Sequence, residues 1–372
     1  MNAPMLTVPQ ADPGAGYRAL KPAIDAAVAR VLESGWYILG KEGEAFEAEF
    51  AAWLGTRRAV GCANGTDALA LILRGMGIGP GDSVATVSHT AVATVAAIEM
   101  VGAAAVLVDI DPATYTMCPK DFAAVAAATG NLRAVIPVHI YGQPCDLDAI
   151  MRTARAHGLK VIEDCSQAHG ARHNNRVVGT IGDAAAFSLY PTKNLAALGD
   201  GGVLATNDTE LADRIAAIRQ YGWKQRYISD LAGVNSRLDE VQAAILRVRL
   251  PHLDAENARR QAIAAAYDKA LAGTRFTPPA RLAGASHVFH QYVLRVEDRA
   301  QLQAALKAQG VATNIHYPVP VHLQPAYLGR VCMGPAACAE TARAAHQVMS
   351  LPMFPQLADA QVEAVCAALR TV

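Results

Sequence analysis

The sequence has no surplus of charge, and this limits the partners that it can attract. Lys and Arg together number 33, and so do Asp and Glu. A balanced chain exerts no long-range attraction on nucleic acid or on an anionic membrane. Long apolar runs are also absent: the most apolar segment, residues 91–98, is far shorter than the about 20 residues that span a bilayer. We therefore expect no nucleic acid and no membrane among the partners, and any anionic ligand must be held locally.

Paired cysteines and a targeting segment are lacking as well. The seven cysteines are scattered and form no C-x-x-C pair, which argues against a metal or redox centre. The chain runs from Met1 into several prolines, without the basic and apolar regions of a signal peptide. No G-x-G-x-x-G follows an early strand, which disfavours an NAD-binding Rossmann enzyme. These absences favour a reduced, cytoplasmic compartment and predict no metal.

The pattern that is present is typical of an α/β protein. The 372 residues are 52% hydrophobic and 18% charged, which predicts an ordered chain of more than one domain. Short β-rich runs alternate with helical stretches, as expected for a mostly parallel sheet with helices on both faces. The expected strands cover residues 83–87, 104–108, 134–138, 159–163, 184–189 and 202–206. A long helical stretch, 236–271, with a break at Pro251, then leads into a smaller α+β region, so we expect domains at 1–250 and 251–372.

Two strand ends and one turn carry candidate chemistry. Asn64 begins a polar turn before a helix, where Gly65 and Thr66 offer backbone N–H groups and a hydroxyl to a phosphate; an ordinary N-cap is the alternative. Asp164 ends a β-branched strand, where an acid can pair with a protonated pyridine nitrogen, although it could equally cap a turn or bind Mg²⁺. Glu163 points to the other face of that strand and is the weaker candidate.

Lys193 follows the next strand end. It lies in the segment FSLYPTKNLAALGDGG between hydroxyl residues and glycine-rich turns, the surroundings that a Schiff-base lysine needs. Most lysines are solvated surface groups, so the hypothesis depends on Asp164 and Lys193 occurring on neighbouring strand ends. Gln167 could reach a ring hydroxyl, and Ser188 could add a phosphate contact.

The motifs NGTDAL, IEDCSQAHGA, FSLYPTKNLAALGDGG, GVNSRLDEVQAA and IHYPVPVHLQPAY, in this order, resemble those of the DegT/DnrJ/EryC1/StrS family of sugar aminotransferases. The likeness runs from the SGWYILG segment, residues 34–40, to Pro352. It implies the type I, aspartate-aminotransferase-like fold, with a mostly parallel sheet of the seven-stranded type and a smaller C-terminal α+β domain. It also implies pyridoxal 5'-phosphate as cofactor and pyridoxamine 5'-phosphate as its aminated form.

The resemblance assigns roles to particular residues. Lys193 is then the Schiff-base lysine, Asp164 the partner of the pyridine nitrogen and Gln167 that of the ring oxygen. Phosphate contacts fall to Gly65, Thr66 and Ser188. Asn235 contributes to the phosphate from a second subunit, which implies a homodimer with shared active sites; helix capping is its alternative role.

The sequence departs from the family pattern at one position of the site, and further residues are candidates for contacts with the sugar. Ala91 stands where many members have an aromatic residue, so His89 becomes the candidate for a flat contact with the ring, unless it is an ordinary hydrogen-bonded turn histidine. The candidates for sugar or diphosphate contacts are Tyr37, Tyr221, Arg226, His316 and Tyr317. Interface packing of Tyr221, a solvated Arg226 and a strand-end His316 are the alternatives.

The implied reaction transfers the amino group of L-glutamate to a nucleotide-linked keto sugar. The GDGG run, Gln220–Trp223 and Ile315–Pro318 more closely resemble enzymes acting at C3 of dTDP-3-oxo-6-deoxyhexoses than those acting at C4. Alternatives are C4 amination, a UDP or GDP carrier, and a regulatory homologue without catalysis. The regulatory and dehydratase homologues commonly replace the lysine, so the presence of Lys193 argues against them.

Overall fold

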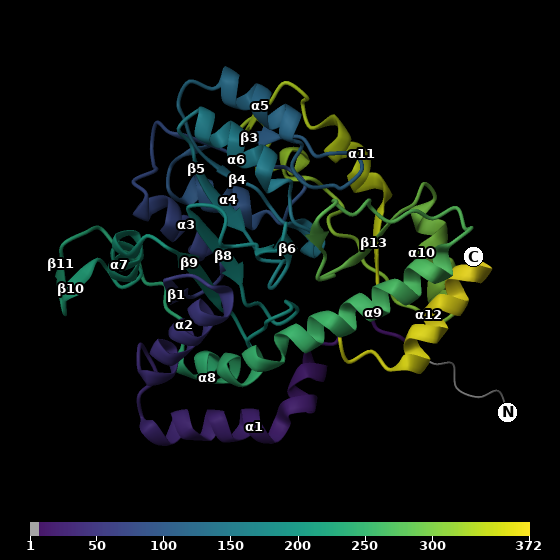
Figure 1. Ribbon diagram of the computed structural model, residues 1–372, viewed down its shortest axis with the longest axis horizontal. Helices are drawn as coiled ribbons and strands as arrows, with labels where there is room; N and C mark the ends of the chain where they lie inside the picture. The colour runs from purple at the N-terminus through teal and green to yellow at the C-terminus, as the bar shows by residue number, and fades with distance from the viewer. Residues whose placement is uncertain (1–6) are drawn as a thin grey trace.

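The computed structural model describes residues 7–372 and centres on an eight-stranded sheet (Figure 1). β9 (Gly202–Thr206) runs antiparallel to both neighbours, β1 (Arg58–Cys62) and β8 (Ala184–Ser188), whereas the pairs from β8 across to β14 (Cys332–Met333) are parallel. The expected α/β class with a mostly parallel sheet is confirmed. In spatial order the strands are β1 (Arg58–Cys62), β9 (Gly202–Thr206), β8 (Ala184–Ser188), β5 (Lys160–Asp164), β4 (Leu132–Ile136), β2 (Ser83–Val87), β3 (Ala104–Val108) and β14 (Cys332–Met333).

The expected strands agree with the observed ones to within two residues. β2, β3 and β9 have the expected bounds, and β5 begins and ends one residue later. Two strands of the central sheet, β1 and β14, were not predicted from the sequence. β1 contains Arg58 and Gly61, which interrupt a β-rich pattern, and β14 has only two residues, too few for any periodicity. With β14 the sheet has one strand more than the seven-stranded type.

Side chains alternate between the two faces of the sheet and bury helices on both. On one face Ile162 and its neighbours pack against α3 (Gly65–Gly75), α4 (Ala93–Met100) and α7 (Thr209–Ile218). On the other face Phe187 and Val161 pack in clusters that include α2 (Lys41–Leu54), α8 (Glu240–Arg249), α5 (Pro119–Ala128) and α6 (Leu147–Ala156). The carboxyl ends of the parallel strands therefore meet at one edge between helical layers, where ligands of such sheets bind.

A long helical connection leads from the sheet to the C-terminal region (Figure 1). α8 ends at Arg249, a short 3₁₀ turn (Leu250–His252) follows, and α9 spans Leu253–Leu271. Because Pro251 has no N–H to donate, the α-helical ladder is interrupted there. The predicted break at Pro251 is confirmed.

The C-terminal region has its own apolar cluster. β13 (Tyr292–Arg295) pairs antiparallel with β15 (Val348–Leu351), and α9 packs there with α10 (Arg299–Ala308) and α12 (Asp359–Thr371). Val8 and Ala15, which flank the start of α1 (Pro13–Ser34), pack into the same cluster. Conversely, β14 joins the central sheet from beyond residue 251. The domain division at 250/251 stays a prediction, because chain segments cross it in both directions.

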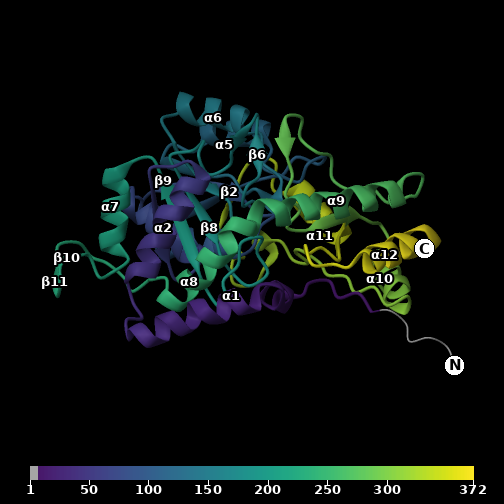
Figure 2. The ribbon, with the colours of Figure 1, turned by 60° about the horizontal axis from the view of Figure 1, so that its bottom comes forward.

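Smaller elements complete the structure. The hairpin of β10 (Trp223–Gln225) and β11 (Ile228–Ser229) projects from the body in both ribbon views (Figures 1 and 2). Among residues 7–372 no helix is both long and apolar enough to cross a membrane. The remaining elements are β6 (Arg172–His173), β7 (Arg176–Val177), β12 (Ala285–Ser286), α11 (Ala339–Gln347) and the 3₁₀ turns Ile140–Gly142 and Val321–Leu323.

Candidate active site

A cavity of about 600 Å³ lies at the carboxyl edge of the sheet. Its wall combines the turn before α3, the segment leading into α4, the ends of β5 and β8, and the segments around residues 290 and 316. The predicted site residues on this wall are Gly65, Thr66, Asp164, Gln167, Ser188, Lys193, His316 and Tyr317. Residues far apart in the sequence are thus brought together by the parallel strands.

Lys193 lies in the turn that follows β8. Its backbone N–H donates to the carbonyl of Tyr190 at 2.8 Å, and Leu189 bonds to Gly201 at 2.8 Å, so both ends of the turn are fixed. Burial lowers the pKa of Lys193 to about 8, although the negative charge of Asp164 opposes this shift. About a tenth of the amine is therefore neutral, and nucleophilic, at pH 7, far more than for an ordinary lysine.

Asp164 ends β5 with its carboxylate on the cavity wall. It is 5% exposed, and its two oxygens accept hydrogen bonds from the Thr94 hydroxyl at 2.9 Å and the Ser166 N–H at 3.1 Å. These donors fix the orientation of a charged group that faces the cavity. The carboxylate can therefore pair with a cationic ring nitrogen of a ligand.

Glu163 lies on the opposite face, as its position in the strand predicts. It accepts hydrogen bonds from the N–H groups of Gly179, Ile181 and Gly182 at 2.7–2.8 Å and lies 3.2 Å from His139. Burial opposes its ionisation, but His139 and these donors hold the pKa of Glu163 below its usual value. This carboxylate anchors a loop and does not reach the cavity wall.

Gln167, Tyr141 and Tyr317 form a linked group beside Asp164. The Gln167 carbonyl oxygen accepts from the Tyr141 N–H at 2.6 Å, and its amide donates to the Tyr317 hydroxyl at 3.0 Å. The Tyr141 hydroxyl in turn donates to the carbonyl of His316. The residues predicted for the ring and the sugar are therefore parts of one hydrogen-bonded wall.

The start of α3 has the form of an anion cradle. The Asn64 side chain caps the helix by accepting from the Asp67 N–H at 2.8 Å. A Cβ placed on Gly65 would lie 2.7 Å from the Cβ of Ser188, so only glycine permits this approach of the helix to β8. The cavity consequently has backbone donors and two hydroxyls, those of Thr66 and Ser188, at a positive helix end.

Five predicted contacts lie elsewhere in the described chain. His89 is buried, and its Nε2 lies 2.7 Å from the Tyr141 hydroxyl, to which it donates because that hydroxyl gives its own proton to the carbonyl of His316. It is not part of the cavity wall, where Ala91 stands instead. This geometry gives no support for its ring contact. The other four, Tyr37, Tyr221, Arg226 and Asn235, are exposed and outside the wall.

Several residues of the site had no sequence prediction. Thr94 orients Asp164, and its hydroxyl also bonds to that of Thr90 at 2.9 Å. The spacing of two threonines one helical turn apart, after a strand, was the available signal. Ser236 donates to Asp67 at 2.6 Å and accepts from Ala63 N–H at 3.1 Å, which ties the cradle to the chain before α8. Nothing local in the sequence indicates that contact.

Comparison with known proteins gives a match across the chain. The sequence profile of the DegT/DnrJ/EryC1/StrS aminotransferase family matches residues 19–370. A pleiotropic regulatory protein of Geobacillus stearothermophilus is 44% identical, over 98% of this chain and 97% of its own. A dTDP-3-amino-3,4,6-trideoxy-alpha-D-glucose transaminase of Streptomyces venezuelae is 47% identical, over 98% and 95%. A UDP-N-acetyl-3-dehydro-alpha-D-glucosamine 3-aminotransferase of Acidithiobacillus ferrooxidans is 42% identical, over 98% and 97%.

The fold also has close counterparts among solved structures. The crystal structure of DesV from S. venezuelae superimposes with a TM-score of 0.94 at 47% sequence identity and covers 98% of each chain. This agreement extends over the sheet, the helical connection and the C-terminal region together.

Proposed function

Since the chain belongs to the DegT/DnrJ/EryC1/StrS aminotransferase family, we propose that it transfers the amino group of L-glutamate to C3 of a dTDP-linked 3-oxo-6-deoxyhexose. The protein is a sugar aminotransferase, and pyridoxal phosphate is its cofactor. The observation that carries the proposal is the placement of Lys193 and Asp164 on the wall of one cavity, opposite a helix N-terminus.

The residues of the cavity fit this cofactor. Gly65, Thr66 and Ser188 would hold the phosphate, because the start of α3 and the end of β8 offer them as donors to an anion and leave no room for a side chain at Gly65. Asp164 would hold the ring nitrogen, and Lys193 would hold the aldehyde carbon. The bound cofactor supplies a carbon that takes up the amino group and a ring that withdraws electrons.

Within this site Lys193 is the base. His290 and His316 also lie on the wall, but burial, reinforced by the charge of Lys193, lowers the pKa of His316 to about 4 and that of His290 well below its usual value. Both histidines are therefore neutral near neutral pH, and their lowered pKa makes them weaker bases than Lys193. Lys193 Nζ would therefore take the proton from Cα of glutamate in the first half-reaction. In the second half-reaction it would deliver a proton to the sugar carbon that receives the amino group.

The names of the relatives support the position of amination more strongly than the carrier. The S. venezuelae and A. ferrooxidans proteins are both named for an amino group at C3, but one name specifies dTDP and the other UDP. A UDP-linked 3-keto sugar is accordingly the second candidate substrate. The regulatory name of a third relative does not change the proposal, because Lys193 is present.

We assign the active unit to a homodimer in the cytoplasm. Asn235 is exposed and away from the cavity of its own chain, as a residue directed at a partner's phosphate site would be. Large apolar side chains are also exposed around the C-terminal end of α1 and the β10–β11 hairpin: Leu32, Trp36, Tyr37, Tyr221, Tyr227 and Ile228. Such a surface suits burial against a second subunit. All seven cysteines are unpaired, which suits a reducing compartment.

The test starts from the purified enzyme. We expect an absorbance band at roughly 400–430 nm from the lysine-bound cofactor, which disappears in Lys193→Ala. Incubation with glutamate and a panel of dTDP- and UDP-linked 3- and 4-keto sugars follows, with NMR of the product to distinguish C3 from C4. Turnover should fall at least about 10³-fold in Lys193→Ala and stay unchanged in Lys160→Ala, an exposed lysine near Asp183. Full activity of Lys193→Ala would refute the assignment.

A further inference from the structure

A second, smaller cavity lies behind Lys193. This rear cavity has a volume of about 120 Å³, the space of about four water molecules. The N-terminal segment, the turn that carries Lys193, the helical connection and the segment after β15 all contribute to its wall. Four polar side chains of this wall, those of Asn194, Arg249, Arg260 and His290, are each at least nine-tenths buried.

Three polar atoms on these side chains have no hydrogen-bond partner within the described chain. They are the Asn194 carbonyl oxygen, Arg260 Nε and His290 Nδ1. A buried polar atom without a partner costs about 1–3 kcal/mol, and such atoms are rare in folded proteins. Arg260 Nε can only donate, so an acceptor such as a carboxylate oxygen would complete it, whereas the Asn194 carbonyl oxygen can only accept and needs a donor such as water.

The charged side chains of the wall indicate the sign of the charge that a ligand of this cavity has. Arg249 reaches the cavity from the end of α8 and donates to the carbonyl of Ala196 at 2.8 Å; Arg260, on α9, donates to the carbonyls of Phe289 and Met353, each at 3.1 Å. These acceptors are neutral. Two acids line the cavity: Asp12 pairs with Arg18, and Glu256 accepts from Gln356 at 2.9 Å.

Glu256 is thus the one carboxylate of the wall that is free to balance two buried guanidinium groups. Burial lowers the pKa of Arg260 to about 10, partly offset by Glu256, so the group remains charged near neutral pH. Buried positive charge without a full counter-charge is unfavourable, and an anion that enters this cavity relieves it.

The rear cavity adjoins the active site. Thr192, Lys193, His290, Gln291 and His316 line both. An amino acid whose Cα lies at Lys193 can therefore extend a carboxylate group of a few atoms into the space behind the lysine. We infer that Arg249 and Arg260 bind a carboxylate of the amino donor in the rear cavity. This inference rests on the proposed function, since it names the site for the donor of that reaction.

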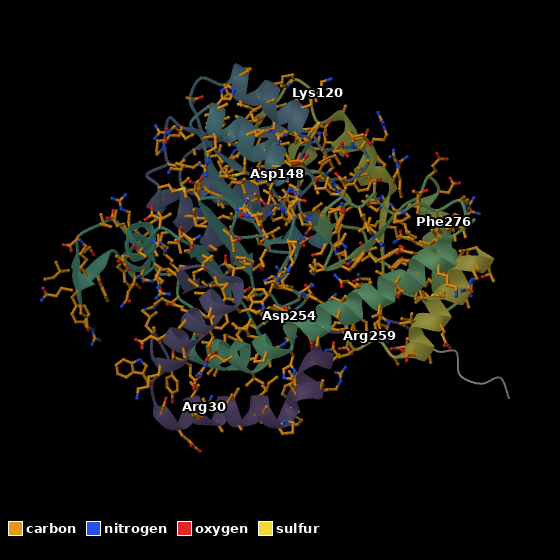
Figure 3. The ribbon with its side chains drawn as sticks, in the orientation of Figure 1. Arg30, Lys120, Asp148, Asp254, Arg259 and Phe276 are labelled. Atoms are coloured by element: carbon orange, nitrogen blue, oxygen red, sulfur yellow. The ribbon has the colours of Figure 1, made fainter. Side chains whose placement is uncertain are left out.

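Glutarate, which has the two carboxylates of the donor and no amino group, tests the inference without turnover. Its binding to the holoenzyme is measured by calorimetry. We expect Arg249→Gln and Arg260→Gln to weaken glutarate binding about 10- to 100-fold, the effect of losing hydrogen bonds to a charged group. Two neighbouring arginines outside the cavity are matched controls. Arg247 pairs with Glu42 and Glu49, and Arg259, labelled in Figure 3, reaches from α9 to Asp359 at the start of α12.

Kinetics give the second readout. The KM for glutamate in the first half-reaction should rise by the same factor in the two cavity variants, whereas the reverse reaction of an aminated sugar, which has no such carboxylate, should keep its rate. If Arg260→Gln does not fold, Arg249→Gln decides alone. Unchanged glutarate affinity in the cavity variants, or absence of binding to the unmodified enzyme, would overturn the inference. Failure of the proposed function has a different signature: glutarate binds, but no keto sugar is aminated.

Discussion

The adjacent carboxylates Glu163 and Asp164 on β5 have different surroundings, and these give Asp164 a role in the active site and Glu163 a role in the fold. Asp164 has two donors and faces the active-site cavity, while Glu163 has three backbone donors and a buried histidine on the other face. The alternation of a strand could be predicted from sequence, and with it the choice of Asp164. The donor Thr94 could not, because it comes from α4, a contact made only once the sheet has formed.

The two acids should therefore respond differently to loss of charge. Asp164→Asn keeps the shape of the side chain but removes the charge opposite the ring nitrogen, so the half-reaction with glutamate should slow about 100-fold. Glu163→Gln should leave that rate within a factor of about two and instead lower the free energy of unfolding by about 3 kcal/mol, since it breaks a buried pair. Stopped-flow absorbance and thermal denaturation measure the two effects. Equal half-reaction rates in both variants would contradict the division of roles.

Lys193 should show its lowered pKa before the cofactor binds. In cofactor-free protein its pKa of about 8, against 10.5 for an ordinary lysine, makes the amine reactive more than two pH units earlier. Labelling of Lys193 by an amine-specific reagent, followed by mass spectrometry, should rise with a midpoint near pH 8, while Lys160 follows an ordinary lysine. A midpoint above 10 for Lys193 would show that burial does not perturb it.

The same shift has a consequence for folding. The unfolded chain keeps this proton up to about pH 10.5, whereas the folded chain releases it near pH 8. The charged, buried amine therefore destabilises the fold in full below pH 8, and this penalty disappears as the pH rises from 8 to 10.5. In cofactor-free Lys193→Met, stability should lose this part of its pH dependence.

At the scale of elements, the approach of α3 to β8 forms the cradle. Gly65→Ala adds a methyl group that would lie 2.7 Å from the Ser188 Cβ, even though alanine favours a helix. We expect the cofactor to bind at least about tenfold more weakly, with a loss of about 1–3 kcal/mol in stability from overpacking. Equilibrium dialysis of the cofactor measures the first effect. Gly130→Ala, where an added Cβ has no atom within 4 Å, is the control and should bind as the unmodified enzyme does.

The elements themselves were largely predictable, and the exceptions have a common cause. The apolar strands β2, β3 and β9 have local patterns strong enough to fix both ends. β14 is a strand only because Cys332 and Met333 pair with Val106 and Leu107 of β3. The rear cavity is likewise composed of segments from both ends of the chain, and no motif marks it. Contacts of this kind arise from the tertiary fold, so the sequence pattern contains no signal for them.

At the scale of the whole molecule, the prediction concerns the second subunit. If Asn235 serves the partner's site, a dimer of one Lys193→Ala and one Asn235→Ala subunit has one site with both residues and one with neither. Random mixing of the two inactive proteins should therefore restore about a quarter of the normal activity, since half of the dimers are hybrids and each has one intact site. The control is a mixture of Lys193→Ala and Asp164→Asn. Both residues line the cavity of their own chain, so pairing two different subunits creates no intact site. In that control each hybrid still has one defect in each cavity, and activity should stay at the background of the variants. Mass spectrometry of the mixture establishes that hybrids form; hybrids without recovered activity would place Asn235 outside the shared site.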